Sequence, residues 1–153
     1  MKFSRVVCSP EEKSTIRRLF TKAIRQVKLL FRASDYGFCI KKFHEKCDGV
    51  GDSLTVVWTE FDRKIGGYTP LKWSSQDAWV ADNSKESFIF SLTHNDKFTM
   101  EKTENAIYNH SSYGPTFGGG HDFCIRDKAN SSIGSYVNIC YSYHNTKYTK
   151  GSK

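Results

Sequence analysis

The chain has 153 residues, enough for one domain with a sizeable hydrophobic core, and its 23 Lys and Arg against 16 Asp and Glu give a formal net charge of +7. This charge favours acidic partners or surfaces, although it does not distinguish nucleic acid from anionic lipid or acidic protein. We expect neither a membrane span nor a secretory signal, because no apolar run reaches the required length, and the five scattered cysteines favour free thiols in a reducing, cytoplasmic compartment.

The first predicted element is an amphipathic helix that follows a flexible tail over residues 1–8. Ser9 and Glu12 form a capping box around Pro10, and apolar residues recur at helical spacing from Ile16 to Val27. The opposite face of this helix is basic. It is either a solvated face or a partner surface, and the candidate contact residues on it are Arg17, Arg18, Lys22 and Arg25.

Two short elements are expected next. The stretch 28–34, "KLLFRAS", predicts a buried strand, and Gly37 suits a turn that needs a positive φ. A second helix then places Ile40, Phe43 and Cys47 on one side, and Gly49 can end it.

From Ser53 onward the pattern changes to short strands, rich in β-branched and aromatic residues. They are predicted within residues 53–61, 65–69, 86–92, 105–110, 122–127 and 135–143. Helices followed by strands, without alternation, favour an α+β fold built as a two-sheet antiparallel β-sandwich flanked by short helices. We expect a single domain over residues 9–146 and a basic tail over residues 147–153.

A glycine cluster raises the question of a phosphate-binding loop. Such a loop would need a Lys and a Ser or Thr that open a helix, whereas Gly118, Gly119 and Gly120 lead through His121 and Asp122 into an apolar alternation. We therefore predict a backbone role, in which the glycines permit a bulge or a close crossing and Pro115 fixes the approach.

Two H-x-x-C pairs, His44 with Cys47 and His121 with Cys124, contain four possible zinc ligands. Residues three apart share a face in a helix but point to opposite faces in a strand, so the second pair should not converge on one ion. Buried thiols and hydrogen-bonded histidines are the favoured interpretation.

Other chemistries have weaker support. No protease-like signature surrounds any cysteine, and only Cys8 lies outside the expected core, in the tail. Trp58, Trp73 and Trp79 would stack on bases in a nucleic-acid-binding sheet, but core and sheet packing is favoured. We expect no catalytic residue, no cofactor and no metal.

Several motifs in sequence order resemble the TLDc domain family, from about Lys28 to Ser142. They lie in residues 37–55, in "GGYT" with Gly66 and Gly67, in "FIFSL" over 88–92, and in "YGPTFGGGHD" over 113–122. The resemblance implies a two-sheet sandwich without established catalytic machinery. It also implies protein partners, because members are associated with oxidative-stress resistance and several bind and restrain the peripheral sector of the vacuolar ATPase.

Two departures from the family pattern carry expectations. Cys39 stands where members usually place a small polar residue, so the second helix should lack its own side-chain cap. The family's final acidic, aromatic strand is not found: either the fold has an open edge, or a partner supplies the strand, or the sequence is cut short. The leading hypothesis is a non-catalytic, protein-binding domain that regulates the ATPase; the alternative is a structural subunit docked through its basic helix or open sheet edge.

Overall fold

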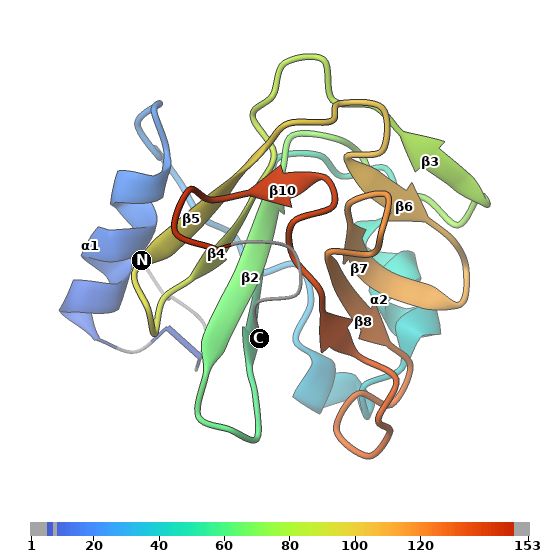
Figure 1. The fold of residues 1–153 in the computed structure, drawn as a ribbon. Helices are drawn as coiled ribbons and strands as arrows, with labels where there is room; N and C mark the ends of the chain where they lie inside the picture. Colours follow the sequence, from blue (N-terminus) through green and yellow to red (C-terminus); the bar gives the residue numbers. More distant parts are fainter. Residues whose placement is uncertain (1–5, 8, 149–153) are drawn as a thin grey trace.

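The computed structural model describes residues 6, 7 and 9–148 and contains two antiparallel five-stranded sheets with two short α-helices outside them (Figure 1). The predicted α+β sandwich is confirmed. The first sheet has the order β1-β2-β4-β5-β10 and the second β3-β6-β7-β8-β9. The strands are β1 Ser53–Trp58, β2 Lys64–Thr69, β3 Ala78–Val80, β4 Phe88–Ser91, β5 Asp96–Met100, β6 Ile107–Asn109, β7 Tyr113–Phe117, β8 Phe123–Arg126, β9 Tyr136–Val137 and β10 Tyr143–His144.

Helix α1 spans Pro10–Leu19 and begins as predicted, with the capping box between Ser9 and Glu12 fully formed. The prediction that it continues to Val27 is wrong. The chain turns to an extended conformation at Phe20, whose ring packs edge-on against the sheet, and Lys97 Nζ donates to the C=O of Leu19 at 2.5 Å. Tertiary packing therefore ends a helix that the periodicity alone would extend.

The predicted strand at 28–34 is also wrong. Residues 22–32 are extended but pair with no described strand, and a 3₁₀-helix follows at Ala33–Tyr36. Leu30 and Phe31 pack against the core, while Leu29 is 47% exposed, so only part of the apolar run is used for burial. The predicted turn at Gly37 is present, with φ of 61°.

Helix α2 spans Ile40–Cys47 and lies against the second sheet (Figure 1). As expected, its N-cap residue Cys39 makes no side-chain capping bond. The carboxylate of Asp127, which follows β8, accepts from the N–H of Ile40 at 2.9 Å instead. A distant segment thus supplies the cap that the local sequence lacks.

The predicted β1–β2 hairpin, β4, β6 and β8 are present, whereas the stretch 135–143 splits into β9 and β10. Three strands were not predicted: β3, β5 and β7. Strand β7 contains Gly114 and Pro115, which is why its sequence reads as a turn. The register with β8 shifts between Tyr113 and Thr116, and such a bulge is where a strand tolerates proline.

The core lies between the sheets and under α2, where Phe43 and Trp73 join Ile89, Phe98, Phe117 and Phe123. Strand β2 contacts this core at the predicted glycine pair, Gly66 and Gly67. A Cβ on Gly67 would lie 2.7 Å from the ring of Phe117, so glycine lets that ring pack directly on the strand.

Of the predicted tails, Val6, Val7, Lys147 and Tyr148 lie within the described residues, and Cys8 lies outside them. Val7 is buried, and the hydroxyl of Tyr148 donates to Asp96 at 2.6 Å. None of the described helices is long and apolar enough to cross a membrane.

Candidate protein-binding surface

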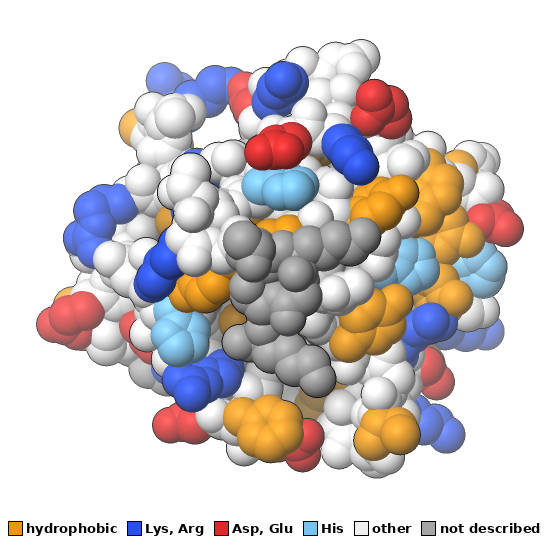
Figure 2. Space-filling view, in the orientation of Figure 1, with side chains coloured by type: hydrophobic (Ala, Val, Ile, Leu, Met, Phe, Trp, Pro, Cys, Tyr) orange, Lys and Arg blue, Asp and Glu red, His pale blue; other side chains and the backbone are white. Residues whose placement is uncertain are grey.

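The outer face of the second sheet carries a group of stacked aromatic and histidine side chains, which we call the aromatic surface. Figure 2 shows hydrophobic and histidine side chains gathered on the side of the molecule where β3 and β6 lie. The aromatic surface consists of Trp79, Tyr108, His110, Tyr113, His121 and Tyr136. Trp79 and Tyr136 are 39% and 41% exposed, so rings of this surface are open to contact.

Side chains alternate between the two faces of a strand, and this alternation directs the first two rings outward. Trp79 on β3 and Tyr108 on β6 are paired in register, and their ring centroids lie 4.5 Å apart. Their neighbours Val80 and Ile107 point inward to the core. Because successive side chains in a strand point to opposite faces, the buried neighbours fix both rings outward.

The remaining rings come from the first residues of β7 and β9, Tyr113 and Tyr136, and from the loops that contain His110 and His121. The ring of His121 stacks on Tyr108 at 5.4 Å and lies edge-on to Tyr113 at 5.7 Å, and its Nδ1 is 3.1 Å from the hydroxyl of Tyr136. The guanidinium of Arg126 lies 3.7 Å from the centroid of the Tyr113 ring. These contacts hold the rings in place before any partner binds.

The electrostatics of the surface follow from these contacts. The hydroxyl of Tyr108 donates to the carboxylate of Asp77 at 2.5 Å, and this bond raises the pKa of Tyr108 to about 12. Burial and the nearby Arg126 lower the pKa of His121 below its ordinary value. At neutral pH His121 is therefore uncharged, so the surface is both aromatic and able to donate and accept hydrogen bonds.

The predicted glycine motif lies beside this surface and shapes the backbone. Gly118 has φ of 83°, and a Cβ there would collide with the carboxylate of Asp122. That carboxylate is fully buried and accepts from the backbone N–H groups of Tyr141, Ser142 and Tyr143 at 2.9, 3.0 and 3.1 Å. The motif therefore fastens the carboxyl-terminal segment to the second sheet, with no helix start that would suit a phosphate.

The next two glycines of the motif, Gly119 and Gly120, also lie close to the segment that leads into β10. The side chain of Tyr141, just before β10, leaves little room beside both glycines. A Cβ on Gly119 would lie 3.0 Å from it, and a Cβ on Gly120 would lie 2.8 Å from it. The N–H of Gly119 donates to Ser142 Oγ at 2.8 Å, which adds a second attachment.

The four predicted basic contact residues do not share one helix face. Arg17 and Arg18 lie on α1, whereas Lys22 and Arg25 follow its end, in the extended segment. All four are exposed; the guanidinium of Arg18 donates to Ser14 and Thr15, and Lys22 pairs with Glu86 at 2.5 Å. The structure therefore does not bring them together as the predicted single stripe.

The predicted H-x-x-C residues are in separate environments. His44 Nδ1 lies 2.7 Å from Asp48 and its Nε2 lies 2.9 Å from the C=O of Tyr113, so both ring nitrogens are engaged. Cys124 is buried and accepts from Thr116. Among residues 6, 7 and 9–148 there is no group of three or more His, Cys, Asp or Glu side chains that could hold a metal.

The buried thiols are poorly suited to thiolate chemistry. Burial, with a smaller contribution from Asp48, raises the pKa of Cys47 to about 11, and burial also raises the pKa of Cys124 and Cys140. A thiol with a raised pKa is a weak nucleophile at neutral pH.

Trp73 packs in the core and Trp79 packs on the sheet face against Tyr108, as core and sheet packing predicts, although Trp58 and Trp79 remain 55% and 39% exposed. Sequence reasoning missed the aromatic surface because it did not decide which aromatic residue takes which position. One signal was present: within "AIYNH", Ile107 and Asn109 flank Tyr108, so a strand with Ile107 in the core must direct Tyr108 outward.

Comparison with protein-family models gives one match: the model of the TLDc domain covers residues 1–153. No curated protein matches the chain.

Proposed function

Because the chain belongs to the TLDc domain family, we propose that it is a non-catalytic, protein-binding domain whose partner is the peripheral sector of the vacuolar ATPase. The aromatic surface is the observation that carries the binding role. Tyr and Trp are enriched at interface hot spots, and rings already held by stacking lose little conformational entropy on binding. We propose that any protection against oxidative stress acts through the partner in a reducing compartment, since burial raises the pKa of three of the thiols, Cys47, Cys124 and Cys140.

The test is affinity capture of the tagged chain from its own cells at moderate salt, with mass spectrometry of the bound proteins. Recovery of ATPase peripheral subunits, lost in the double variant Trp79→Ala with Tyr136→Ala, is the expected result. Phe61→Ala is the matched control, because Phe61 is 77% exposed in the turn after β1 and belongs to neither the aromatic surface nor the core. Recovery of a different stable set of proteins would refute the ATPase as partner.

The alternative, a structural subunit of a larger assembly docked through basic residues, is tested in the same capture. Replacing Arg17, Arg18, Lys22 and Arg25 with Glu would abolish capture if these residues make the contact, whereas the aromatic double variant would then bind normally. The two results exclude each other.

A further inference from the structure

Strand β1 forms one edge of the first sheet, and no strand within residues 6, 7 and 9–148 pairs with its outer side. The β1–β2 turn is closed by a hydrogen bond from the N–H of Thr59 to the C=O of Arg63, at 2.8 Å. Bonded pairs alternate along an antiparallel ladder, so Val57 also bonds to β2, while Leu54 and Val56 direct their N–H and C=O groups to the open edge. No hydrogen bond from residues 6, 7 or 9–148 reaches these outward groups.

Strand β1 itself carries no feature that would block pairing at this edge. The sequence of β1, "SLTVVW", contains no charge and no proline, and its six residues pair with β2 in continuous register without a bulge. Folded proteins generally blunt such an edge with Lys, Pro, a bulge or a covering segment. An unprotected apolar edge is therefore a template for another strand.

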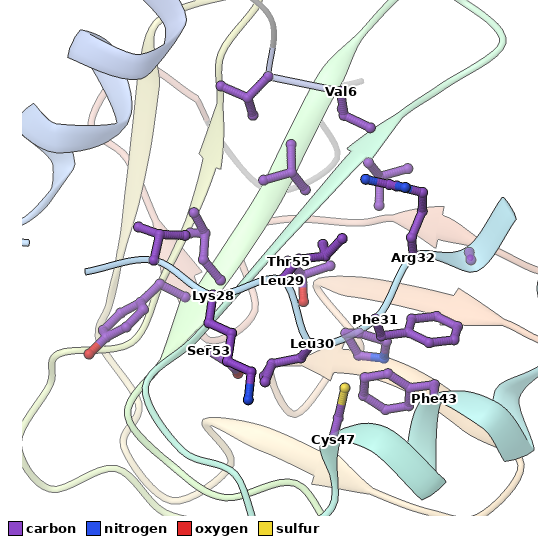
Figure 3. Close-up of a pocket in the computed structure, with 18 of the residues that line it drawn as sticks. Val6, Lys28, Leu29, Leu30, Phe31, Arg32, Phe43, Cys47, Ser53 and Thr55 are labelled. Atoms are coloured by element: carbon purple, nitrogen blue, oxygen red, sulfur yellow. The ribbon is translucent and has the colours of Figure 1, made fainter. Parts of the chain in front are cut away.

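A groove of about 800 Å³ lies along this edge (Figure 3). All six residues of β1 line one side of it, and residues 22–33 line another. Figure 3 shows Lys28, Leu29, Leu30 and Phe31 along this second wall, with Phe43 and Cys47 of α2 below. The groove therefore offers apolar pockets together with unpaired backbone groups.

The charge of the groove is strongly one-sided. Its lining includes five cationic residues but a single acid, Asp52; the cations are Lys22, Arg25, Lys28, Arg32 and Arg126. Arg25 and Lys28 are exposed and have no ion-pair partner within the described part of the chain. The Nε of Arg32 is buried with no hydrogen-bond acceptor, which is rare for a buried polar atom.

We propose that this groove binds an acidic peptide in extended conformation, which pairs with β1 as an added strand. Backbone bonds to Leu54 and Val56 hold the peptide, alternate apolar side chains enter the groove, and acidic side chains face Arg25, Lys28 and Arg32. The added strand would pair with the first sheet, whereas the aromatic surface lies on the second, although Arg126 contributes to both; the inference does not depend on the identity of the partner proposed above.

Charge and hydrogen bonding argue against the other occupants. A fatty acid would supply the negative charge but would leave the backbone groups of β1 without partners. A second copy of β1 would satisfy those groups, but its sequence contains no acid that could pair with the cationic wall.

The probe is a capped peptide of alternating Val and Glu, six residues long to match β1, with its affinity measured by titration calorimetry. We expect saturable binding that weakens with salt. A peptide with the same side chains but N-methylated backbone should bind at least about tenfold more weakly, because it cannot donate to the strand. Absence of binding to the wild-type chain, or equal binding of the methylated peptide, would overturn the proposal.

The same contacts can be tested by changing the protein instead of the peptide. Val56→Pro removes an outward N–H without breaking the β1–β2 ladder and should weaken binding about tenfold, whereas Val56→Thr keeps the N–H and should bind normally. Replacing Arg25 and Lys28 with Glu should weaken binding by a similar factor. The matched control replaces Lys41 and Lys46 with Glu, since both are exposed on α2 and outside the groove.

If Val56→Pro does not fold, the methylated peptide and the charge reversal decide the result. Equal loss in the charge-reversal variant and in its control would show a general field effect and refute the site. A dimer that Val56→Pro dissociates would assign the edge to a second copy instead. ATPase capture that fails while the peptide binds would refute only the proposed partner.

Discussion

Asp122→Ala is expected to be the most destabilising single change in the glycine motif. In the folded chain the Asp122 carboxylate accepts three backbone N–H groups from residues 141–143. Ser142 and Tyr143 are fully buried, so removal of the carboxylate leaves two donors without an acceptor or water. The third donor, at Tyr141, belongs to a residue that is 40% exposed and can bond to solvent.

The magnitude follows from those two donors. Each buried, unsatisfied donor costs roughly 1–3 kcal/mol, so we expect a loss of about 4 kcal/mol in the free energy of unfolding. Domains of this size are stable by about 5–15 kcal/mol, and the loss corresponds to a fall in Tm of roughly 8–16 °C. The loss should be local as well, because β5 is the one strand of the described chain that pairs with β10, and Asp122 supplies three of the bonds that hold residues 141–143 to the second sheet.

Urea denaturation followed by far-UV circular dichroism measures the loss, and hydrogen exchange locates it. The amides of Ser142 and Tyr143 should exchange faster than those of β4. Asp122→Asn keeps one acceptor oxygen and should lose about half as much, whereas Asp35→Ala removes only an exposed ion pair and should cost less than about 1 kcal/mol. A loss below about 1 kcal/mol for Asp122→Ala would refute the role of the carboxylate as an anchor.

Three further changes test other parts of the fold. Gly118→Ala places a Cβ against the buried carboxylate at a φ of 83° and should lower the free energy of unfolding by more than about 2 kcal/mol. Gly37→Ala, with open space at a φ of 61°, should lower it by only about 1 kcal/mol. Equal losses in urea denaturation would contradict this. Asp127→Ala removes the cap of α2 and should cost about 0.5–2 kcal/mol by the same assay, and no change would show that solvent caps the helix as well. Burial and Arg126 lower the pKa of His121, so below pH of about 6.5 the unfolded chain binds more protons than the folded one and stability falls. His121→Asn should therefore flatten the loss of stability between pH 7 and pH 5, and an unchanged slope would assign it to other groups.

Local chemistry explains which elements could be predicted from the sequence. The start of α1 depends on Ser9 and Glu12, which lie within one turn of each other, and it is confirmed. The end of α1 depends on Phe20 and on Lys97, which follows far along the chain, and a local pattern contains no trace of that contact. The cap of α2 by Asp127 could not be predicted for the same reason.

The candidate surface was missed because core packing and sheet-face packing were predicted for the aromatic residues together, without deciding which residue takes which position. Trp73 is buried and its Nε1 donates to Ser53 at 2.8 Å, whereas Trp79, with equal hydrophobicity, faces outward because Val80 occupies the inner position. Composition cannot separate these two cases; the strand register decides them. An open sheet edge was predicted, but its position at β1 could not be, since it depends on which strands pair and on the helix ending at Leu19.

The motif over residues 113–122 contains residues with two different roles, an inner pair in the fold and an outer pair on the surface. Gly118 and Asp122 are committed to the fold, because the glycine admits the carboxylate and the buried carboxylate has its hydrogen bonds within the chain. Tyr113 and His121 belong to the same motif but lie on the aromatic surface. Changes to the inner pair should therefore reduce stability, whereas changes to the outer pair should reduce binding with little loss of stability. The motif thus combines the anchoring of residues 141–143 with the positioning of two rings of the aromatic surface.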